Sequence, residues 1–134
     1  PKGVCISHRA VMAALTMLNE HAPFHADDKV ASQSAFCYDL SVFDLFAAFK
    51  VGACVHLLPP EIMKVPNAFI DYVQEHQLTS LYMVSSALEY IFKYAKASAT
   101  KLHFKRILLT GDPISPTLIE LLKEKVNPEC TILN

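Results

Sequence analysis

Short apolar segments alternate with segments of helical periodicity along the chain, and this alternation restricts the possible folds more than any other feature. The apolar segments are continuous rather than interrupted by polar residues at every second position, as expected for strands buried on both faces. Strands are predicted at residues 4–6, 30–35, 53–58, 80–84, 106–110 and 131–134.

Helices are predicted between these strands, where apolar residues recur every three or four positions. The first follows Ser7 as a cap and ends at Pro23, and the others span residues 41–49, 67–75, 87–95 and 116–126. Val42, Leu45, Phe46 and Phe49 carry the pattern in the second helix, and Pro59-Pro60 predicts an extended loop. Repeated strand–helix–strand units predict an α/β fold, an open parallel sheet with helices on both faces.

Composition limits the class of protein. The 134 residues fit one domain, and 52% of them are hydrophobic and 19% charged. A buried parallel sheet explains this apolar excess, and so does a subdomain whose interfaces with a larger protein are exposed. The net charge of −1, without a basic run, argues against nucleic acid as a partner. No apolar run reaches the ~18 residues of a membrane span and no signal-peptide pattern is present, so we expect a cytoplasmic protein with no membrane contact.

The four cysteines are predicted to be small buried residues with free thiols. None of them forms a Cys-x-x-Cys pair, and Cys5 and Cys54 lie inside apolar runs. A zinc site or a disulfide framework is the alternative. His21 and His25 are four residues apart, but Pro23 breaks the helix that would align them, so no metal site is expected there.

Polar residues follow three of the predicted strands. Asp39 comes after the second strand, further residues follow Tyr82, and Thr110-Gly111-Asp112 ends another strand. Because ligands of open parallel sheets bind at the carboxyl ends of the strands, these positions favour a binding site. Asp39 or Ser41 is alternatively the N-cap of the helix that follows, and the local sequence leaves both interpretations open.

Three segments together resemble the amino-acid adenylation domains of nonribosomal peptide synthetases and of stand-alone amino-acid ligases. Residues 38–46 (YDLSVFDLF) are similar to the substrate-pocket motif of that family. Residues 1–4 (PKGV), followed by Ser7-His8, are similar to the end of its phosphate loop, and residues 109–116 (LTGDPISP) to its Gly-Gly-Glu segment. The resemblance covers the whole chain, and it implies a flavodoxin-like subdomain of a larger adenylation domain.

The resemblance implies a role for Asp39 as the counter-ion of the substrate's ammonium group. A buried ammonium group must be paired with an anion, so an aspartate at this position favours an α-amino acid over an aryl or hydroxy acid. The pocket walls then correspond to Leu40, Phe43, Tyr82 or Met83, Leu108 and Thr110. Tyr82 is preferred over Met83 because residues 82–88 (YMVSSAL) resemble a segment of proline-activating relatives. These walls suit proline or another small apolar amino acid.

The resemblance also implies some of the residues that bind the nucleotide. Lys2 and Gly3 match the end of the phosphate loop, Tyr38 matches an aromatic residue beside the reacting carboxylate, and Gly111 and Asp112 match the segment along the adenine. Thr110 replaces the first glycine and Asp112 the glutamate of that segment, which weakens the match. The family's adenine-stacking motif, ribose-binding aspartate and catalytic lysine would follow Asn134, so no catalytic residue is expected within residues 1–134.

The implied function is that of an AMP-forming ligase in natural-product biosynthesis. The parent enzyme would use ATP and Mg²⁺ to adenylate an amino acid, and would load it onto the phosphopantetheine thiol of a peptidyl carrier protein. Residues 1–134 would be a single substrate-binding subdomain, truncated at both ends and inactive without the remaining parts of the adenylation domain. The alternatives are a non-catalytic flavodoxin-like scaffold or exchange module, and a piece of an acyl-CoA or aryl-acid ligase.

Overall fold

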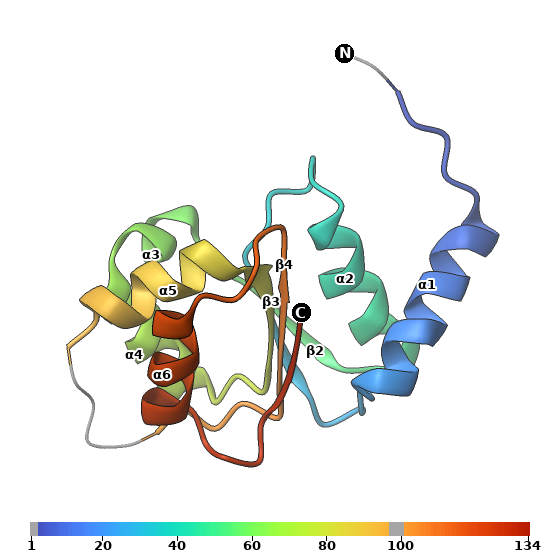
Figure 1. The fold of residues 1–134 in the computed structure, drawn as a ribbon. Helices are drawn as coiled ribbons and strands as arrows, with labels where there is room; N and C mark the ends of the chain where they lie inside the picture. The colour runs from blue at the N-terminus through green and yellow to red at the C-terminus, as the bar shows by residue number, and fades with distance from the viewer. Residues whose placement is uncertain (1–2, 97–100) are drawn as a thin grey trace.

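The computed structural model describes residues 3–96 and 101–134 and confirms the predicted α/β fold (Figure 1). Five parallel strands form one sheet in the order β2-β1-β3-β4-β5. Their bounds are Lys29–Ser32 for β1, Cys54–Leu57 for β2, Ser80–Val84 for β3, Arg106–Thr110 for β4 and Thr131–Leu133 for β5.

In the described part of the chain, six helices cover the two faces of this sheet. They are α1 (His8–His21), α2 (Leu40–Val51), α3 (Pro60–Lys64), α4 (Pro66–His76), α5 (Ser85–Tyr94) and α6 (Pro116–Lys125). Helices α1 and α2 lie on one face, and α3 to α6 lie on the other (Figure 1). Each face has its own hydrophobic core, the smaller beneath α1 and α2 and the larger beneath α4, α5 and α6.

The ends of several helices follow from their sequences. The Ser7 hydroxyl accepts a hydrogen bond from the Ala10 N–H at 3.2 Å, and the Ser115 hydroxyl accepts one from the Leu118 N–H at 3.0 Å. Both satisfy N–H groups that the first helical turn leaves free. Gly52 ends α2 in the left-handed conformation that glycine adopts without strain.

Two of the predicted elements are wrong. Residues 4–6 form no strand, and the side chains of Val4 and Ile6 are exposed, because this segment lies away from the sheet. The segment after Pro59 begins the short helix α3 rather than an extended loop. Proline is well suited to the first helical turn, where its missing N–H leaves no hydrogen bond unmade, and Pro60 occupies that position.

The prediction of buried cysteines is also wrong, although all four thiols are free. Cys5, Cys37 and Cys54 are exposed, and Cys130 is half-buried. Cys54 lies on β2, which is at the edge of the sheet, and Cys5 lies in the segment that precedes α1. Within residues 3–96 and 101–134, no group of three or more His, Cys, Asp or Glu side chains could hold a metal ion.

A buried ion pair at the amino end of the sheet connects β3 and β4 with the turn before β1. Arg106 Nη1 lies 2.6 Å from Asp28 Oδ2 and also donates a hydrogen bond to the Ser80 hydroxyl. The His25 N–H donates to the same carboxylate at 2.8 Å, and Lys105 Nζ lies 3.0 Å from its other oxygen. Burial raises the pKa of Asp28, but these hydrogen bonds and charges outweigh it and hold the pKa below its ordinary value.

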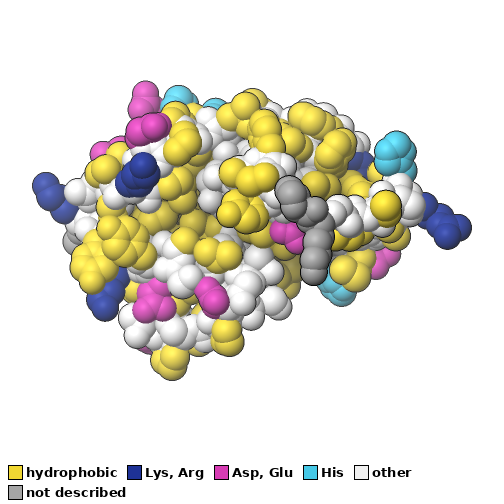
Figure 2. Space-filling view, turned by 90° about the horizontal axis from the view of Figure 1, so that it is seen from above, with side chains coloured by type: hydrophobic (Ala, Val, Ile, Leu, Met, Phe, Trp, Pro, Cys, Tyr) yellow, Lys and Arg dark blue, Asp and Glu magenta, His cyan; other side chains and the backbone are white. Residues whose placement is uncertain are grey.

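The opposite end of the sheet, where the strands finish, carries many apolar side chains. Figure 2 views the molecule from this end, and hydrophobic side chains cover much of the face. Phe36 and Tyr38, in the segment that follows β1, are exposed, and so is Val84, the last residue of β3. No helix among the described residues meets the length and apolarity that a bilayer span requires.

Candidate functional site

Three polypeptide segments meet at the carboxyl end of the sheet. Strand β3 lies between β1 and β4, so the loop after β1, the end of β3 and the end of β4 are neighbours. Asp39 lies at the end of that loop, Tyr82 lies within β3, and Thr110 is the last residue of β4. The topology therefore brings together residues that are far apart in the sequence, as ligand sites of open parallel sheets require.

Asp39 does not use its side chain to cap α2. It occupies the position before the helix with helical backbone angles, and its carboxylate makes no capping hydrogen bond. The nearby Ser41 hydroxyl donates instead to the Tyr38 carbonyl oxygen at 2.7 Å. The Asp39 side chain is exposed in this chain, so its carboxylate is open to a ligand.

Phe43 and Tyr82 form a wall beside this carboxylate. Their rings pack edge to face, with centroids 5.6 Å apart and an angle of 76° between the planes. Leu108 is paired with Tyr82 across β3 and β4, and all three residues contribute to the core beneath α1 and α2. Leu40 is half-buried at the first position of α2.

The Tyr82 hydroxyl connects this wall with polar groups. Burial raises the pKa of Tyr82, and a hydrogen bond with Thr110 opposes that rise. The negative charges of Asp39 and Asp44 raise the pKa further, so both carboxylates lie within electrostatic range of the hydroxyl. Predicted pocket residues from α2, β3 and β4 thus occupy one region of the structure.

Met83 lies on the opposite face of the sheet. Successive residues of a strand point to opposite faces, so Met83 and Tyr82 face opposite sides of β3. The Met83 side chain is fully buried in the larger core, which packs against α4, α5 and α6. The sequence allowed either Tyr82 or Met83 to form this wall. Tyr82 lies beside Phe43, whereas Met83 belongs to the core on the other face.

The residues matched to nucleotide binding are more dispersed. Tyr38 is exposed in the loop before α2, and Gly3 is exposed in the segment before α1. Lys2 lies outside the described residues. The Asp112 carboxylate accepts a hydrogen bond from the Ser86 hydroxyl at 2.7 Å, and its carbonyl oxygen accepts one from Ser85 at 3.0 Å. These bonds fix the segment after β4 against the start of α5.

Gly111 is required by the backbone of this segment. Its φ angle is +83°, and a Cβ atom added there would lie 3.1 Å from Val84 Cγ1. We expect Gly111→Ala to lower the free energy of unfolding by about 1–2 kcal/mol, because an L-residue is strained in this conformation. Urea denaturation followed by circular dichroism measures the change.

Gly3→Ala is the matched control for this substitution. A Cβ atom at Gly3 meets no atom within 4 Å, so the free energy of unfolding should stay within about 0.5 kcal/mol of the original. Equal effects of the two substitutions would contradict a specific requirement for glycine at position 111.

Asp44, a buried acidic residue near the candidate site, was not predicted from the sequence. Helix α2 packs on the sheet through Ser41, Asp44, Ala47 and Ala48, whereas Phe46 and Phe49 are 50% and 61% exposed. Asp44 itself is only 2% exposed, and burial raises its pKa to about 7. Asp44 is three residues from Ser41 and three from Ala47, a spacing that puts the three on one helix face. Periodicity did not reveal this packed face, because Val42, Leu45, Phe46 and Phe49 formed a stronger apolar pattern on another face.

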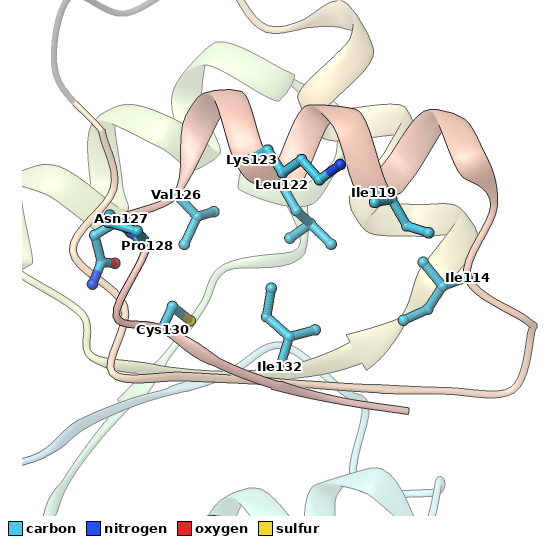
Figure 3. Close-up of a pocket in the computed structure, with 9 residues that line it drawn as sticks. All are labelled: Ile114, Ile119, Leu122, Lys123, Val126, Asn127, Pro128, Cys130 and Ile132. Carbon is cyan, nitrogen blue, oxygen red and sulfur yellow. The ribbon is translucent and has the colours of Figure 1, made fainter.

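A separate pocket lies between α6 and β5, away from these residues (Figure 3). Ile119 and Leu122 point into it from α6, and Ile132 points into it from β5. Its lining is mainly apolar, and Lys123 is the one charged residue in it. None of the predicted site residues that the structure describes lines this pocket, so it is not the candidate substrate site.

A family model and several curated proteins both match this chain. Residues 1–134 match the family described as AMP-binding enzyme. The L-proline–[L-prolyl-carrier protein] ligase of Streptomyces coelicolor is 30% identical over 137 residues, covering 100% of this chain and 25% of the relative. Other matched relatives are covered to a quarter of their length or less.

Solved structures share the fold. The nonribosomal peptide synthetase FmoA3 superposes with a TM-score of 0.88 and 23% identity, over 98% of this chain and 14% of that one. The Vibrio cholerae adenylation domain AlmE, in complex with glycyl-adenosine-5'-phosphate, gives a TM-score of 0.80 and 22% identity over 90% of this chain and 23% of that one. At these identities the similarity establishes the fold alone.

Proposed function

The chain belongs to the AMP-binding enzyme family, and from this premise we propose that the whole protein is an amino-acid-activating ligase. It adenylates an amino acid with ATP and transfers the aminoacyl group to the phosphopantetheine thiol of a peptidyl carrier protein. Residues 1–134 supply the amino-acid pocket, and the remaining parts of the adenylation domain complete the site. A non-catalytic scaffold is not favoured, because the family match is to an enzyme.

One observation carries this proposal: the open carboxylate of Asp39 at the carboxyl end of the sheet, beside the wall of Phe43 and Tyr82. Asp39 pairs with the substrate's ammonium group, and the remainder of the enzyme shields the pair from water. An ammonium group in such an enclosure needs an anion and hydrogen bonds. An aryl or hydroxy acid would leave the Asp39 charge unpaired, which disfavours ligases of those acids.

The residues of the proposed pocket wall support a small apolar amino acid. Phe43 and Tyr82 are half-buried aromatic residues backed by the buried Leu108, and Leu40 and Thr110 are half-buried at the edges of this wall. Proline is the leading candidate, because a relative that matches the entire chain is named as a proline ligase. This assignment to proline is our proposal for the present chain.

The nucleotide lies on the other side of the reacting carboxylate. We assign Lys2 and Gly3 to the phosphates, Tyr38 to the neighbourhood of the reacting carboxylate, and Gly111 and Asp112 to the adenine. The described residues contain no cluster that could hold a metal ion, so Mg²⁺ would arrive with the ATP phosphates, as is usual for this ion. Mg²⁺ would neutralise the charge of the ATP phosphates. We propose that the reaction takes place in the cytoplasm, where ATP and free thiols are available.

ATP–pyrophosphate exchange with the complete enzyme tests this function. We expect exchange with L-proline or a similarly small α-amino acid, and about a hundredfold less with the des-amino counterpart cyclopentanecarboxylate, because only the amino acid neutralises Asp39. Equal exchange with both acids would reject the amino-acid assignment. Exchange with neither acid but with aryl or fatty acids would assign the chain to another branch of the family.

A further inference from the structure

Asp44 is buried without a hydrogen-bond partner. Neither carboxylate oxygen makes a hydrogen bond to any described residue, and the hydroxyl of Ser32, the last residue of β1, also makes none. The hydroxyl lies close enough to lower the carboxyl pKa in part, but burial outweighs it. An unpartnered carboxylate is costly in a protein core, so its presence needs an explanation.

The surroundings of Asp44 place it behind the proposed substrate pocket. It lines a very small cavity with a volume of about 10 Å³. Phe43, Tyr82 and Leu108, the three wall residues of the proposed pocket, line the same cavity. Asp44 therefore lies on the inner side of the wall that Asp39 flanks from outside, and both carboxylates act on the Tyr82 hydroxyl.

No cation neutralises Asp44 from within this cavity. Leu18 of α1, Phe24 and Val30 face it with apolar side chains, and β3 contributes Ser80, Leu81 and Tyr82. Among residues 3–96 and 101–134, lysine, arginine and histidine are absent from its lining. The Arg106 guanidinium lies 4.6 Å from the Phe24 ring, but it is already paired with Asp28.

We propose that Asp44 is a second acidic determinant of amino-acid binding, which releases its proton when the substrate's ammonium group binds at Asp39. This inference rests on the proposed function, because it requires a cationic substrate. Before binding, the neutral and the ionised forms of this carboxyl group coexist near pH 7. The bound ammonium group stabilises the carboxylate through the wall, the Asp44 O–H bond breaks, and the proton passes to solvent.

The expected size of this coupling follows from electrostatics. The proposal requires the bound ammonium group to lie within about 8 Å of Asp44, a distance at which a unit charge shifts a pKa by more than one unit when the effective dielectric constant is about 20. The pKa of Asp44 is about 7 in the unliganded chain, so half of the molecules carry the proton at pH 7. Binding should then release about 0.4 proton per site at pH 7, and affinity should rise about tenfold between pH 5 and pH 8.

Calorimetry of the complete enzyme with its amino acid tests this proposal. Titrations at pH 7 in two buffers of different ionisation enthalpy give the number of protons released on binding. We expect about 0.4 proton for the original enzyme and none for Asp44→Asn, whose amide has nearly the same shape but does not titrate. We also expect Asp44→Asn to bind the amino acid with a flat pH profile, and about tenfold more weakly than the original enzyme at pH 8.

The outcomes separate this inference from the proposed function. If Asp39→Ala leaves amino-acid binding unchanged, the proposed function fails, whatever Asp44 does. If Asp39→Ala abolishes binding but the original enzyme releases no proton at pH 7, the role of Asp44 fails and the proposed function stands. Equal proton release by Asp44→Asn and the original enzyme also overturns the role of Asp44. The proton count of the original enzyme needs no variant, so misfolding of Asp44→Asn would leave the test valid.

Discussion

Arg106→Met is expected to lower the free energy of unfolding by about 3–5 kcal/mol, a large part of the stability of a domain of this size. The substitution leaves the buried carboxylate of Asp28 without the guanidinium that lies 2.6 Å from it. It also removes the hydrogen bond to Ser80 and the contact with the Phe24 ring. Urea denaturation followed by circular dichroism measures the loss.

Lys105→Met is the control for this prediction. Lys105 contacts the same carboxylate at 3.0 Å, but its side chain is 40% exposed, so solvent screens the interaction and we expect a loss of at most about 1 kcal/mol. The pKa of Asp28 lies below its ordinary value, so its contribution is present at neutral pH and is lost as the pH falls below about 4. Equal losses from the two substitutions would show that the Arg106–Asp28 ion pair stabilises the fold no more than the Lys105–Asp28 pair.

Asp39→Ala is expected to reduce ATP–pyrophosphate exchange with the preferred amino acid by about a hundredfold or more in the complete enzyme. The substitution removes the one anion that we assign to the substrate's ammonium group, and an unpaired charge in a closed site is strongly disfavoured. The effect should fall mainly on the KM for the amino acid, with the KM for ATP nearly unchanged.

Asp112→Ala is a useful comparison for Asp39→Ala. Asp112 is also an acidic residue beside the end of a strand, but its carboxylate is engaged by the Ser86 hydroxyl, and we assign it to the nucleotide side. Its loss should raise the KM for ATP more than the KM for the amino acid. If the two substitutions affected the two substrates equally, the division of the site between amino acid and nucleotide would be wrong.

Several elements of the fold were predictable from local pattern alone. Strands β3 and β4 have the predicted bounds, Ser80–Val84 and Arg106–Thr110, because both are continuous apolar runs between polar segments. The pairing of Arg106 with Asp28 was not predictable, because 78 residues separate them in the sequence and only the strand order brings them together.

The candidate site was predictable in outline but not in detail. The position of Asp39 after a strand follows from the alternation of elements, whereas the choice between Tyr82 and Met83 depends on which sheet face α2 covers. Helix α2 is apolar nearly all round, so periodicity alone did not identify its packed face. That face carries Asp44, and it became evident only from the side-chain burial in the structure.

The central claim is that the Asp39 carboxylate selects a positively charged substrate, and one measurement tests it directly. The affinities of the preferred amino acid and of its des-amino counterpart are compared in the original enzyme and in Asp39→Asn, with L-proline and cyclopentanecarboxylate as the pair if proline is preferred. We predict a loss of about a hundredfold for the amino acid and less than about threefold for its counterpart. An equal loss for both ligands would contradict the claim.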